Sequence, residues 1–448
     1  MNSIFDLDHL YRTYFKMALP SVFGLMVSVV YNLADTFFIA QSNDTALIAG
    51  VSLCAPVFTA LMAFGNIYGQ GGSSLISRLL GQDDREGTGR VSSFCFYVAL
   101  TTGVVLAALM MLFRVPLLGI LGATAETMPH AQAYYTVLAI GAPATVLNFI
   151  HSNLVRCEGM ATQSMIGSIG GTVINIILDP IMIFGLLGCP AMGVRGAAYA
   201  TIIGQLVAAV LGIVLNQKHN TDVRVNLKKI RFNFPLIGEI YSIGFPSILM
   251  TAIGSVTTYL MNQILLAFST TASAVYGVYF KLNSFFFMPL FGLNNAVVPI
   301  VAYNYGARNR GRIHQAIRTS TITAVTIMLL GWAAFFFLPV PLLRLFDASE
   351  AMIAIGIPAF RITSFTYPLA AVSIVASSVF QALGKSMYSM LVSLGRQLIV
   401  LIPVAYLFSL TGVLDDVWLA FPIAEVVCLI SSLFFLKKVL HRLDDFPQ

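Results

Sequence analysis

The chain has 448 residues, of which 58% are hydrophobic and 10% are charged, with a formal net charge of +6 and a mean hydropathy of +0.84. Soluble globular proteins carry about 25% charged residues, so this composition excludes that class and predicts an integral membrane protein with many spans. The positive charge does not indicate a nucleic-acid partner, because the basic residues fall in loops between apolar segments.

The residue types that build catalytic, metal and nucleotide sites form no familiar motif. The five cysteines contain no Cys-x-x-Cys pair, and the six histidines contain no His-x-x-x-His pair. There is no Gly-x-x-x-x-Gly-Lys-Ser/Thr loop, so nothing indicates the use of ATP. We therefore expect neither an enzyme with catalytic residues nor a resident metal or organic cofactor.

Twelve apolar segments are long enough to cross a membrane, which takes about 20 residues. They cover roughly residues 16–40, 46–76, 89–112, 130–155, 162–186, 192–215, 235–266, 272–302, 313–337, 352–380, 387–409 and 414–436. Prolines within them predict bent or tilted helices at Pro20, Pro56, Pro143, Pro246, Pro289 and Pro368.

The basic residues predict how the chain is oriented in the membrane. Nineteen of the 25 Lys and Arg residues fall at one end of the spans, and Arg114, Arg195 and Arg344 fall at the other. Because cytoplasmic loops carry an excess of Lys and Arg, we expect a multi-pass protein of the cytoplasmic (inner) membrane with both termini in the cytoplasm. The remaining three basic residues lie inside predicted spans: Lys281, Arg361 and Arg396.

The two halves of the chain repeat one another at an offset near 225 residues. Gly159 corresponds to Gly384, and Ser164 corresponds to Ser389. Six spans per repeat is an even number, so both halves have one orientation, related by an axis along the membrane normal. We predict an all-α integral membrane protein with twelve transmembrane helices in two six-helix lobes of pseudo-two-fold symmetry. The expected lobes are residues 1–216 and 235–448, joined by a basic cytoplasmic linker at 217–234.

The fifth span holds an acid in apolar surroundings. Asn175 and Asp179 are four residues apart and share one face of a helix, while Pro180 leaves the carbonyl of Ile176 without its usual N–H partner. The same face continues with three small polar residues: Ser164, Ser168 and Thr172. Polar contacts between helices explain those three. They do not explain Asp179, because a charge at a helix centre costs roughly 2.5–3.5 kcal/mol. We interpret Asp179 as a cation site.

The first span carries a second acid at a similar depth. Asp35 lies about 19 residues from the cytoplasmic end of its span and Asp179 about 17, so their depths agree within about 3 Å. Two carboxylates at one depth could share a proton or a Na⁺. The alternative is that Asp35 pairs with a basic residue for structure alone. That is disfavoured because the first six spans offer no evident Lys or Arg partner.

Other polar residues of the first half are candidates for substrate contact. They are Ser28, Tyr31 and Asn32 in the first span and Asn153 in the fourth. Each signal is weak by itself, since such residues more often hold helices together. His151 lies near the cytoplasmic end of the fourth span, where we expect it to make a local hydrogen bond.

The second half lacks the acid site. Val400 and Val404 take the positions of Asn175 and Asp179, and Asn262 falls near the position equivalent to Asp35. The three basic residues inside spans of this half could hold an anionic group, or pair with backbone carbonyls and extend to the membrane surface. We favour the structural interpretation. Glu425 has no evident partner in the sequence.

Four motifs together carry a specific resemblance that covers nearly the whole chain. They are Asp-Thr-Phe-Phe-Ile at 35–39, Ile-Ser-Arg-Leu-Leu-Gly-Gln-Asp-Asp at 76–84, Asn-Ile-Ile-Leu-Asp-Pro at 175–180 and Gly-Val-Arg-Gly-Ala-Ala-Tyr-Ala-Thr at 193–201. Through these four motifs the sequence resembles the multidrug and toxic compound extrusion (MATE) family. The resemblance implies two six-helix lobes and cation-driven export of organic, often cationic, compounds.

The acids resemble those of the bacterial DinF-like branch, whose N-terminal lobe carries the coupling site. That branch implies a cation-coupling site of Asp35, Asn175 and Asp179, with Thr201 as the nearest match to its sixth-helix threonine. The NorM-like branch also places acids in the C-terminal lobe, where this chain has Met261 or Asn262. This argues against NorM-type Na⁺ coupling, so H⁺ is the expected coupling ion and Na⁺ the alternative.

We therefore expect a secondary antiporter, in which a proton or Na⁺ enters and an organic cation leaves. The alternative is a flippase for a lipid-linked precursor from the same superfamily, which would need clustered basic residues in its cavity. A channel or receptor would need a continuous polar path or a large outer domain, and neither is visible. The expected partners are small cationic or lipophilic substrates and the lipid bilayer, with no nucleic acid and with a monomer as the expected assembly.

Overall fold

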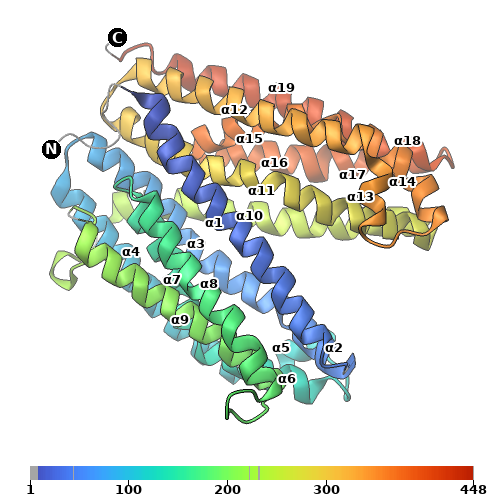
Figure 1. Ribbon diagram of the computed structural model, residues 1–448. Coiled ribbons are helices and arrows are strands. Elements are labelled where there is room, and N and C mark those ends of the chain that lie inside the picture. Colours follow the sequence, from blue (N-terminus) through green and yellow to red (C-terminus); the bar gives the residue numbers. More distant parts are fainter. Residues whose placement is uncertain (1–8, 44, 221, 231–232, 447–448) are drawn as a thin grey trace. The chain divides into compact units, whose positions relative to one another are not determined.

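The computed structural model describes residues 9–446 except 44, 221, 231 and 232, and except the side chains at 32, 33, 36, 46 and 47. All regular elements in these residues are helices (Figure 1). The first half contains α1 (Leu10–Ala40), α2 (Thr45–Leu53), α3 (Ala55–Gly81), α4 (Arg85–Leu112), α5 (Arg114–Ile120), α6 (Met128–Ile140), α7 (Ala142–Arg156), α8 (Ala161–Phe184), α9 (Val194–His219) and the 3₁₀ turn η2 (Leu227–Lys229).

The second half contains a similar series with one unusual segment. Its elements are α10 (Phe234–Leu266), α11 (Thr270–Gly306), α12 (Arg310–Phe337), α13 (Pro339–Arg344), α14 (Glu350–Thr363), α15 (Thr366–Ala382), α16 (Ser386–Leu394), η3 (Gly395–Leu401), α17 (Ile402–Ser409), α18 (Leu414–Trp418) and α19 (Ala420–His441). The η3 segment is a π-helix between α16 and α17. Such wide turns are rare and occur most often at functional sites.

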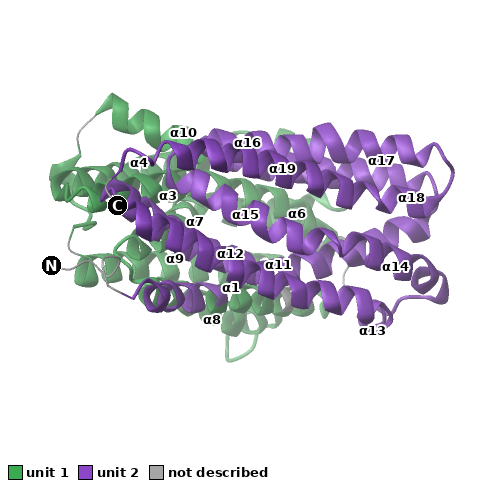
Figure 2. Ribbon diagram, turned by 90° about the horizontal axis from the view of Figure 1, so that it is seen from above, with its two compact units in different colours: residues 1–4, 23–244 green, residues 5–22, 245–448 purple. Residues whose placement is uncertain are grey.

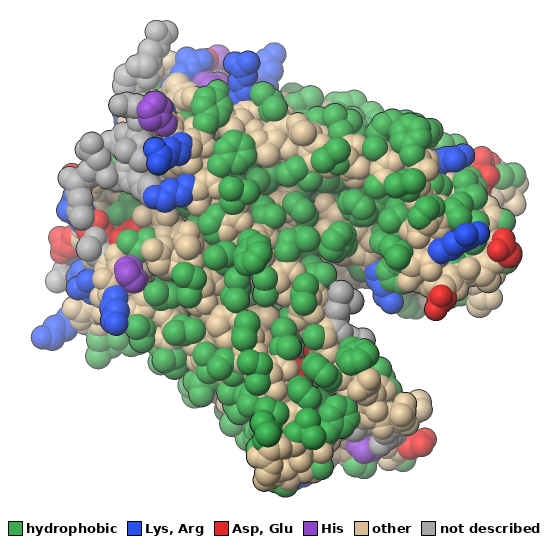
Figure 3. Space-filling model, viewed as in Figure 1, with side chains coloured by type: hydrophobic (Ala, Val, Ile, Leu, Met, Phe, Trp, Pro, Cys, Tyr) green, Lys and Arg blue, Asp and Glu red, His purple; other side chains and the backbone are tan. Residues whose placement is uncertain are grey.

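The predicted twelve spans are confirmed. In the described residues, ten stretches are long and apolar enough to cross a membrane, and two bent helix pairs complete the set. α6 and α7 meet at 54°, and α14 and α15 meet at 47°. Hydrophobic side chains cover the sides of these helices, whereas Lys and Arg gather near their ends (Figure 3). This distribution matches an apolar solvent around the spans.

The predicted span ends are less accurate than the span centres. α1 begins at Leu10 rather than at 16, and α19 continues to His441 rather than ending at 436. Apolar composition marks the part of a helix that lies in lipid, but the backbone hydrogen bonds continue into the aqueous boundary. A boundary drawn from hydropathy alone therefore stops one or two turns early.

Three of the prolines within spans lie where a new helix begins. Pro56, Pro143 and Pro368 lie in the first turns of α3, α7 and α15, where a missing N–H leaves no hydrogen bond unmade. The bends predicted at Pro143 and Pro368 are confirmed. α1, α10 and α11 run through Pro20, Pro246 and Pro289 as continuous helices, so the bends or tilts expected at these three residues stay a prediction.

The chain forms two compact units (Figure 2). Unit 1 contains Phe23–Gly244, and unit 2 contains the beginning of α1 up to Val22 together with the chain from Phe245 onward. Both long leading helices, α1 and α10, are thus shared between units. The predicted lobe boundaries at 217–234 stay a prediction, since the contact division falls inside α1 and α10 instead.

Glycines allow each leading helix to dock. In unit 1, a Cβ added to Gly244 of α10 would come within 2.2 Å of the Ile67 carbonyl oxygen. In unit 2, a Cβ added to Gly292 of α11 would come within 2.7 Å of the Val22 Cα. Only a residue without a Cβ permits these approaches, so each of the two contacts requires glycine at its position.

A pair of glycines joins α8 and α9, which lie side by side in unit 1 (Figure 1). A Cβ on Gly171 would come within 2.4 Å of the Gly204 carbonyl oxygen, and a Cβ on Gly204 would come within 2.9 Å of the Asn175 Cβ. Close contact through small residues is the usual way helices associate in membranes. Here it presses α9 against the helix face that carries the predicted site.

Candidate cation site in the first unit

Asn175 and Asp179 lie on the buried face of α8. The exposed fraction is 3% for Asn175 and 0% for Asp179. Neither carboxylate oxygen of Asp179, nor the side-chain oxygen of Asn175, has a hydrogen-bond partner among the residues that the structure describes. Buried acceptors without partners are rare, because desolvation without a hydrogen bond is unfavourable. These three oxygens are therefore available to a proton or a cation.

The second acid comes from α1. The Asp35 carboxyl group lies beside that of Asp179, close enough for the two to interact directly. Tyr31, one turn earlier on α1, places its hydroxyl within reach of the Asn175 amide and the Thr201 hydroxyl. The structure thus brings together all four residues of the predicted coupling set, along with Tyr31.

Thr201 and a further tyrosine close the site on the side of α9 and α6. Thr201 is buried, and its hydroxyl donates to the Ala197 carbonyl at 3.0 Å. Tyr134 of α6 lies beside Thr201, within electrostatic range of Asp35 and Tyr31. Tyr134 is not among the residues that the sequence predicts for the site, because a tyrosine in an apolar helix is typical of a core residue. Its spacing carries no other signal.

The side chains of the site present oxygen atoms that could bind a cation. Its ligands would be carboxylate, amide and hydroxyl oxygens, which suit a proton or a hard cation rather than a soft metal. No group of three or more His, Cys, Asp or Glu side chains that could hold a metal ion occurs in the described part of the chain. Two carboxylates this close cannot both be ionised without cost, so a single shared proton or monovalent cation fits them best.

The described residues assigned to substrate contact each have their own local partner. Tyr31 belongs to the acid site, as described above. The Ser28 hydroxyl donates to the Gly24 carbonyl of its own helix at 3.1 Å, and the Asn153 amide donates to the Phe149 carbonyl at 2.8 Å. The side chain of Asn32 lies outside the described residues. Their role in substrate binding stays a prediction.

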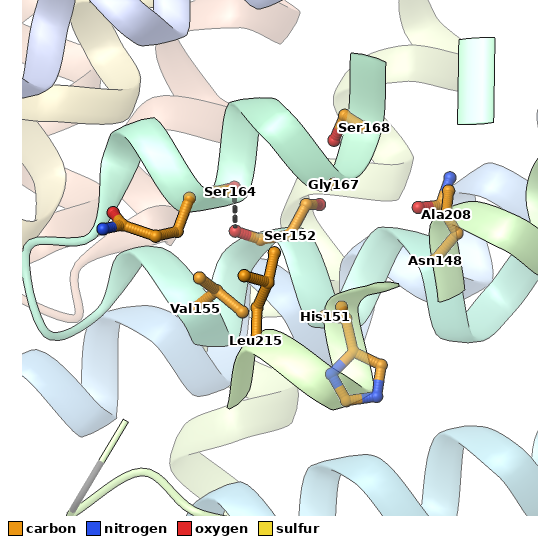
Figure 4. Close-up of a pocket in the computed structure, with 11 residues that line it drawn as sticks. Asn148, His151, Ser152, Val155, Ser164, Gly167, Ser168, Ala208 and Leu215 are labelled. Atoms are coloured by element: carbon orange, nitrogen blue, oxygen red, sulfur yellow. Dashed lines mark hydrogen bonds between the residues drawn. The ribbon is translucent and has the colours of Figure 1, made fainter. Parts of the chain in front are cut away.

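The prediction that His151 makes a local hydrogen bond is wrong. Its ring is buried, and neither nitrogen has a hydrogen-bond partner in the described structure. The ring packs against Phe96 with the ring centroids 5.0 Å apart and points away from Ser152 and Ser164 (Figure 4). Packing on an aromatic neighbour replaced the polar contact that a sequence suggests for histidine.

In unit 2 each of the three basic residues inside spans contacts a residue of the same unit. Arg396 of η3 lies 3.6 Å from Glu425 of α19, which supplies the partner that the sequence did not reveal. The Arg361 Nε donates to the Phe336 carbonyl at 3.1 Å, and its guanidinium lies 5.7 Å from the ring centroid of Phe336. Lys281 lies 6.0 Å from the ring centroid of Phe346. The structural interpretation of these residues is supported.

The position equivalent to Asp35 is also occupied differently in unit 2. Asn262 accepts a hydrogen bond from Ser273 at 3.0 Å, so its amide is used within the unit. Val400 of η3 and Val404 of α17 replace the amide and acid of α8. The oxygen-lined site is thus a feature of unit 1.

Twelve spans, with an acid buried inside one of them, are typical of membrane transport proteins, because ionisable residues within spans mark transport pathways. The MatE family model matches residues 20–181 and 245–407. These two segments reproduce the offset near 225 found in the sequence.

Known relatives and structures agree with that match. The chain is 31% identical to the multidrug export protein MepA of Staphylococcus aureus over 443 residues, covering 98% of this chain and 96% of the relative. The MepA protein of Staphylococcus haemolyticus is 30% identical over the same length. Among solved structures, a MATE protein in the bent conformation has a TM-score of 0.90 at 26% identity, with 97% of this chain and 96% of that chain covered. An outward-facing MATE multidrug resistance transporter has a TM-score of 0.89 at 27% identity and the same coverage. The chain belongs to the MATE family.

Proposed function

We propose that the protein is a secondary antiporter of the cytoplasmic membrane that exports small organic cations in exchange for protons. The observation that carries this proposal is the buried Asp179, whose oxygens have no partner among the described residues, beside Asp35. Relatives named for multidrug export support the substrate class. The basic residue distribution supports cytoplasmic termini.

The coupling follows from competition for the carboxylates. An acid pair that carries one negative charge attracts a lipophilic cation, and a proton from outside neutralises that charge. Substrate affinity must fall on protonation by the same factor by which substrate binding lowers proton affinity. One charge crossing 100 mV supplies about 2.3 kcal/mol, and a pH gradient adds to this. No nucleotide is needed.

The proton can also change how the helices around the site pack. Neutralising Asp179 removes its demand for hydration, so α1 can move closer to α8 and α9. Tyr31 bridges these helices through its reach to Asn175 and Thr201, and the glycine contact holds α9 in place. A ligand shifts such an equilibrium only by its differential affinity for the two states, which the charge on the acid pair provides.

Everted membrane vesicles that carry the protein test this function. We expect ethidium uptake into the vesicles when they are energised, its loss on addition of a proton uncoupler, and its loss in Asp179→Asn. Asn262→Ala serves as the control, because it removes an amide at the repeat-equivalent place in unit 2 without touching the acids. Uptake by Asp179→Asn at the wild-type rate would show that the site is assigned wrongly. Uptake that persists with the uncoupler but stops when Na⁺ is removed would make Na⁺ the coupling ion.

The flippase alternative is less well supported. A lipid-linked precursor carries phosphates, which call for several basic side chains in one place. Arg396, Arg361 and Lys281 are each engaged with a different partner, as described above.

A further inference from the structure

A groove lies between the beginning of α12 and the end of α19 in unit 2. Its volume is about 400 Å³. Eight residues line it: Arg310, His314, Leu433, Leu436, Lys437, Leu440, His441 and Asp444. Lys, Arg and His side chains gather at this end of the unit, near the C-terminus (Figure 3). The groove therefore combines a basic rim with an apolar wall.

The basic rim is organised around one carboxylate. Asp444 lies 2.6 Å from Arg310 and 2.6 Å from His441. The Arg310 Nε donates to the His314 imidazole at 3.4 Å. Asp444 is the one acid in the lining, so it orients two basic side chains without neutralising the rim. The guanidinium of Arg310 keeps further N–H donors for a second anion.

Lys437 leaves an unbalanced charge. It lies one turn before His441 on the same face of α19, and it has no ion pair within the described chain. Lys438, its neighbour in sequence, points elsewhere and lies 5.8 Å from the ring centroid of Tyr388. Lys437 and Lys438 thus lie at similar depths, but only Lys437 faces the groove.

The apolar wall runs beside the basic side chains of α19 and continues one turn further toward the centre of the span. Leu440, Leu436 and Leu433 follow one another down the groove side of α19. From His441 to Leu433 the helix rises about 12 Å at 1.5 Å per residue. Leu440 and Leu436 lie at the levels of His441 and Lys437, and Leu433 lies one turn deeper. Apolar surface thus borders the cations and continues past them, which suits a phospholipid with a charged head and an apolar chain. A free phosphate would use the rim and leave the leucines bare.

We propose that this groove binds an anionic phospholipid, with its phosphate at Arg310 and Lys437 and an acyl chain along Leu436 and Leu433. Arg and Lys are the residues that hold phosphate most strongly. Basic pockets between spans on the cytoplasmic side are suited to anionic headgroups, and the basic end of this chain is the one expected in the cytoplasm. The inference does not depend on the coupling mechanism proposed above.

Native mass spectrometry of the full-length protein in detergent tests the headgroup. Dioleoyl phosphatidylglycerol and dioleoyl phosphatidylcholine are titrated into wild type, Lys437→Gln and Lys438→Gln. We expect wild type to bind phosphatidylglycerol about 10-fold more tightly than phosphatidylcholine. Lys437→Gln should lose about 5-fold, since one basic residue near a lipid surface is worth about 1 kcal/mol, and Lys438→Gln should stay within 2-fold of wild type. Equal affinities for the two lipids, or equal losses in the two variants, would overturn the proposal.

Two further experiments test the apolar wall and distinguish a bound lipid from a bound free phosphate. Leu433→Ala removes wall area inside the groove, whereas Ile430→Ala removes a similar area from an exposed residue of the same helix outside the lining. We expect Leu433→Ala to weaken phosphatidylglycerol binding at least 2-fold and Ile430→Ala to leave it unchanged. Inorganic phosphate and glycerophosphoglycerol are added as competitors at equal concentration. If either displaces phosphatidylglycerol as well as unlabelled lipid does, the groove is a phosphate site and the lipid assignment is wrong.

Discussion

Ser389 donates a hydrogen bond to the carbonyl oxygen of Ser377 at 2.9 Å. In unit 1, Ser164 makes the same bond to Ser152 at 2.7 Å. Both bonds join the start of one helix to the helix before it, across twelve residues, and both donors are buried. The repeat in the sequence is therefore also a repeat in hydrogen bonding, so differences between equivalent positions can be interpreted one by one.

The paired bonds give a symmetric prediction about stability. Ser164→Ala and Ser389→Ala should each lower the free energy of unfolding by about 1 kcal/mol, because each leaves a partly buried carbonyl without its side-chain donor. The two losses should add in the double variant, since the sites share no partner. Thermal unfolding in detergent measures this. A loss confined to one half would show that the two bonds are not equivalent.

The two halves differ most where α8 of unit 1 corresponds to the π-helical segment of unit 2. At the offset of the repeat, Gly171 corresponds to Arg396. Gly171 lets α9 approach the backbone of α8, whereas Arg396 reaches across to Glu425 of α19. One half closes this helix pair with glycine and builds an acid site beside it. The other half fills the pair with an ion pair and has no site there.

The glycine contact should be sensitive to a single methyl group. Gly171→Ala places a Cβ 2.4 Å from the Gly204 carbonyl oxygen. The backbone must shift, which should cost about 1–3 kcal/mol. Gly170→Ala is the matched control, because its Cβ meets only the tip of Leu211, and alanine is the better helix former by about 1 kcal/mol. Unfolding temperatures of the two variants should move in different directions or differ clearly. Equal temperatures would contradict the close packing.

The ion pair in unit 2 should behave as a pair. Arg396→Met leaves Glu425 buried without its cation and should destabilise the protein by roughly 3 kcal/mol or more. The double variant Arg396→Met/Glu425→Met removes both charges and should recover most of this loss. Arg361→Met, which removes a basic residue held by a backbone carbonyl and a ring, should cost less than about 1 kcal/mol. A double variant no more stable than Arg396→Met would show that the pair does not stabilise as a unit.

Much of the fold and of the site could be predicted from the sequence because lipid imposes strong rules. An apolar segment of sufficient length must be a helix, and an acid within it needs a reason, which is why Asp35 and Asp179 stood out. Helix ends were harder, since hydropathy marks the lipid boundary and not the last hydrogen bond. Tyr134 and the Arg396–Glu425 pair were missed because residues far apart in the chain meet only after folding. His151 misled because a polar side chain can be buried against an aromatic ring instead of a hydrogen-bond partner.

The amide of the site should matter less than its acid. Asn175→Ala removes one buried oxygen that has no partner in the described structure, but leaves both carboxylates to bind the proton. We expect transport to fall several-fold and to keep its dependence on the pH gradient, whereas Asp179→Asn abolishes coupled export with no loss of stability. Dye uptake at several external pH values in everted vesicles measures this. An Asn175→Ala protein with no transport at all would show that transport requires the amide as much as the acid.

Substrate binding should depend on pH in one direction. If a proton and a lipophilic cation compete for the acid pair, the affinity of a cationic dye in detergent must weaken as the pH falls, because protonation removes the charge that attracts the dye. Asp35→Asn should flatten this dependence, since a single carboxylate remains and no proton is shared. Asn262→Ala should leave it intact, because that amide accepts from Ser273 in unit 2 and touches neither acid. Titrating dye binding in the three proteins between about pH 5 and 8 covers the range in which close carboxylates can exchange a proton. A wild-type affinity that does not change with pH, or an Asn262→Ala protein that behaves like Asp35→Asn, would exclude a mechanism that uses the acids of one unit alone.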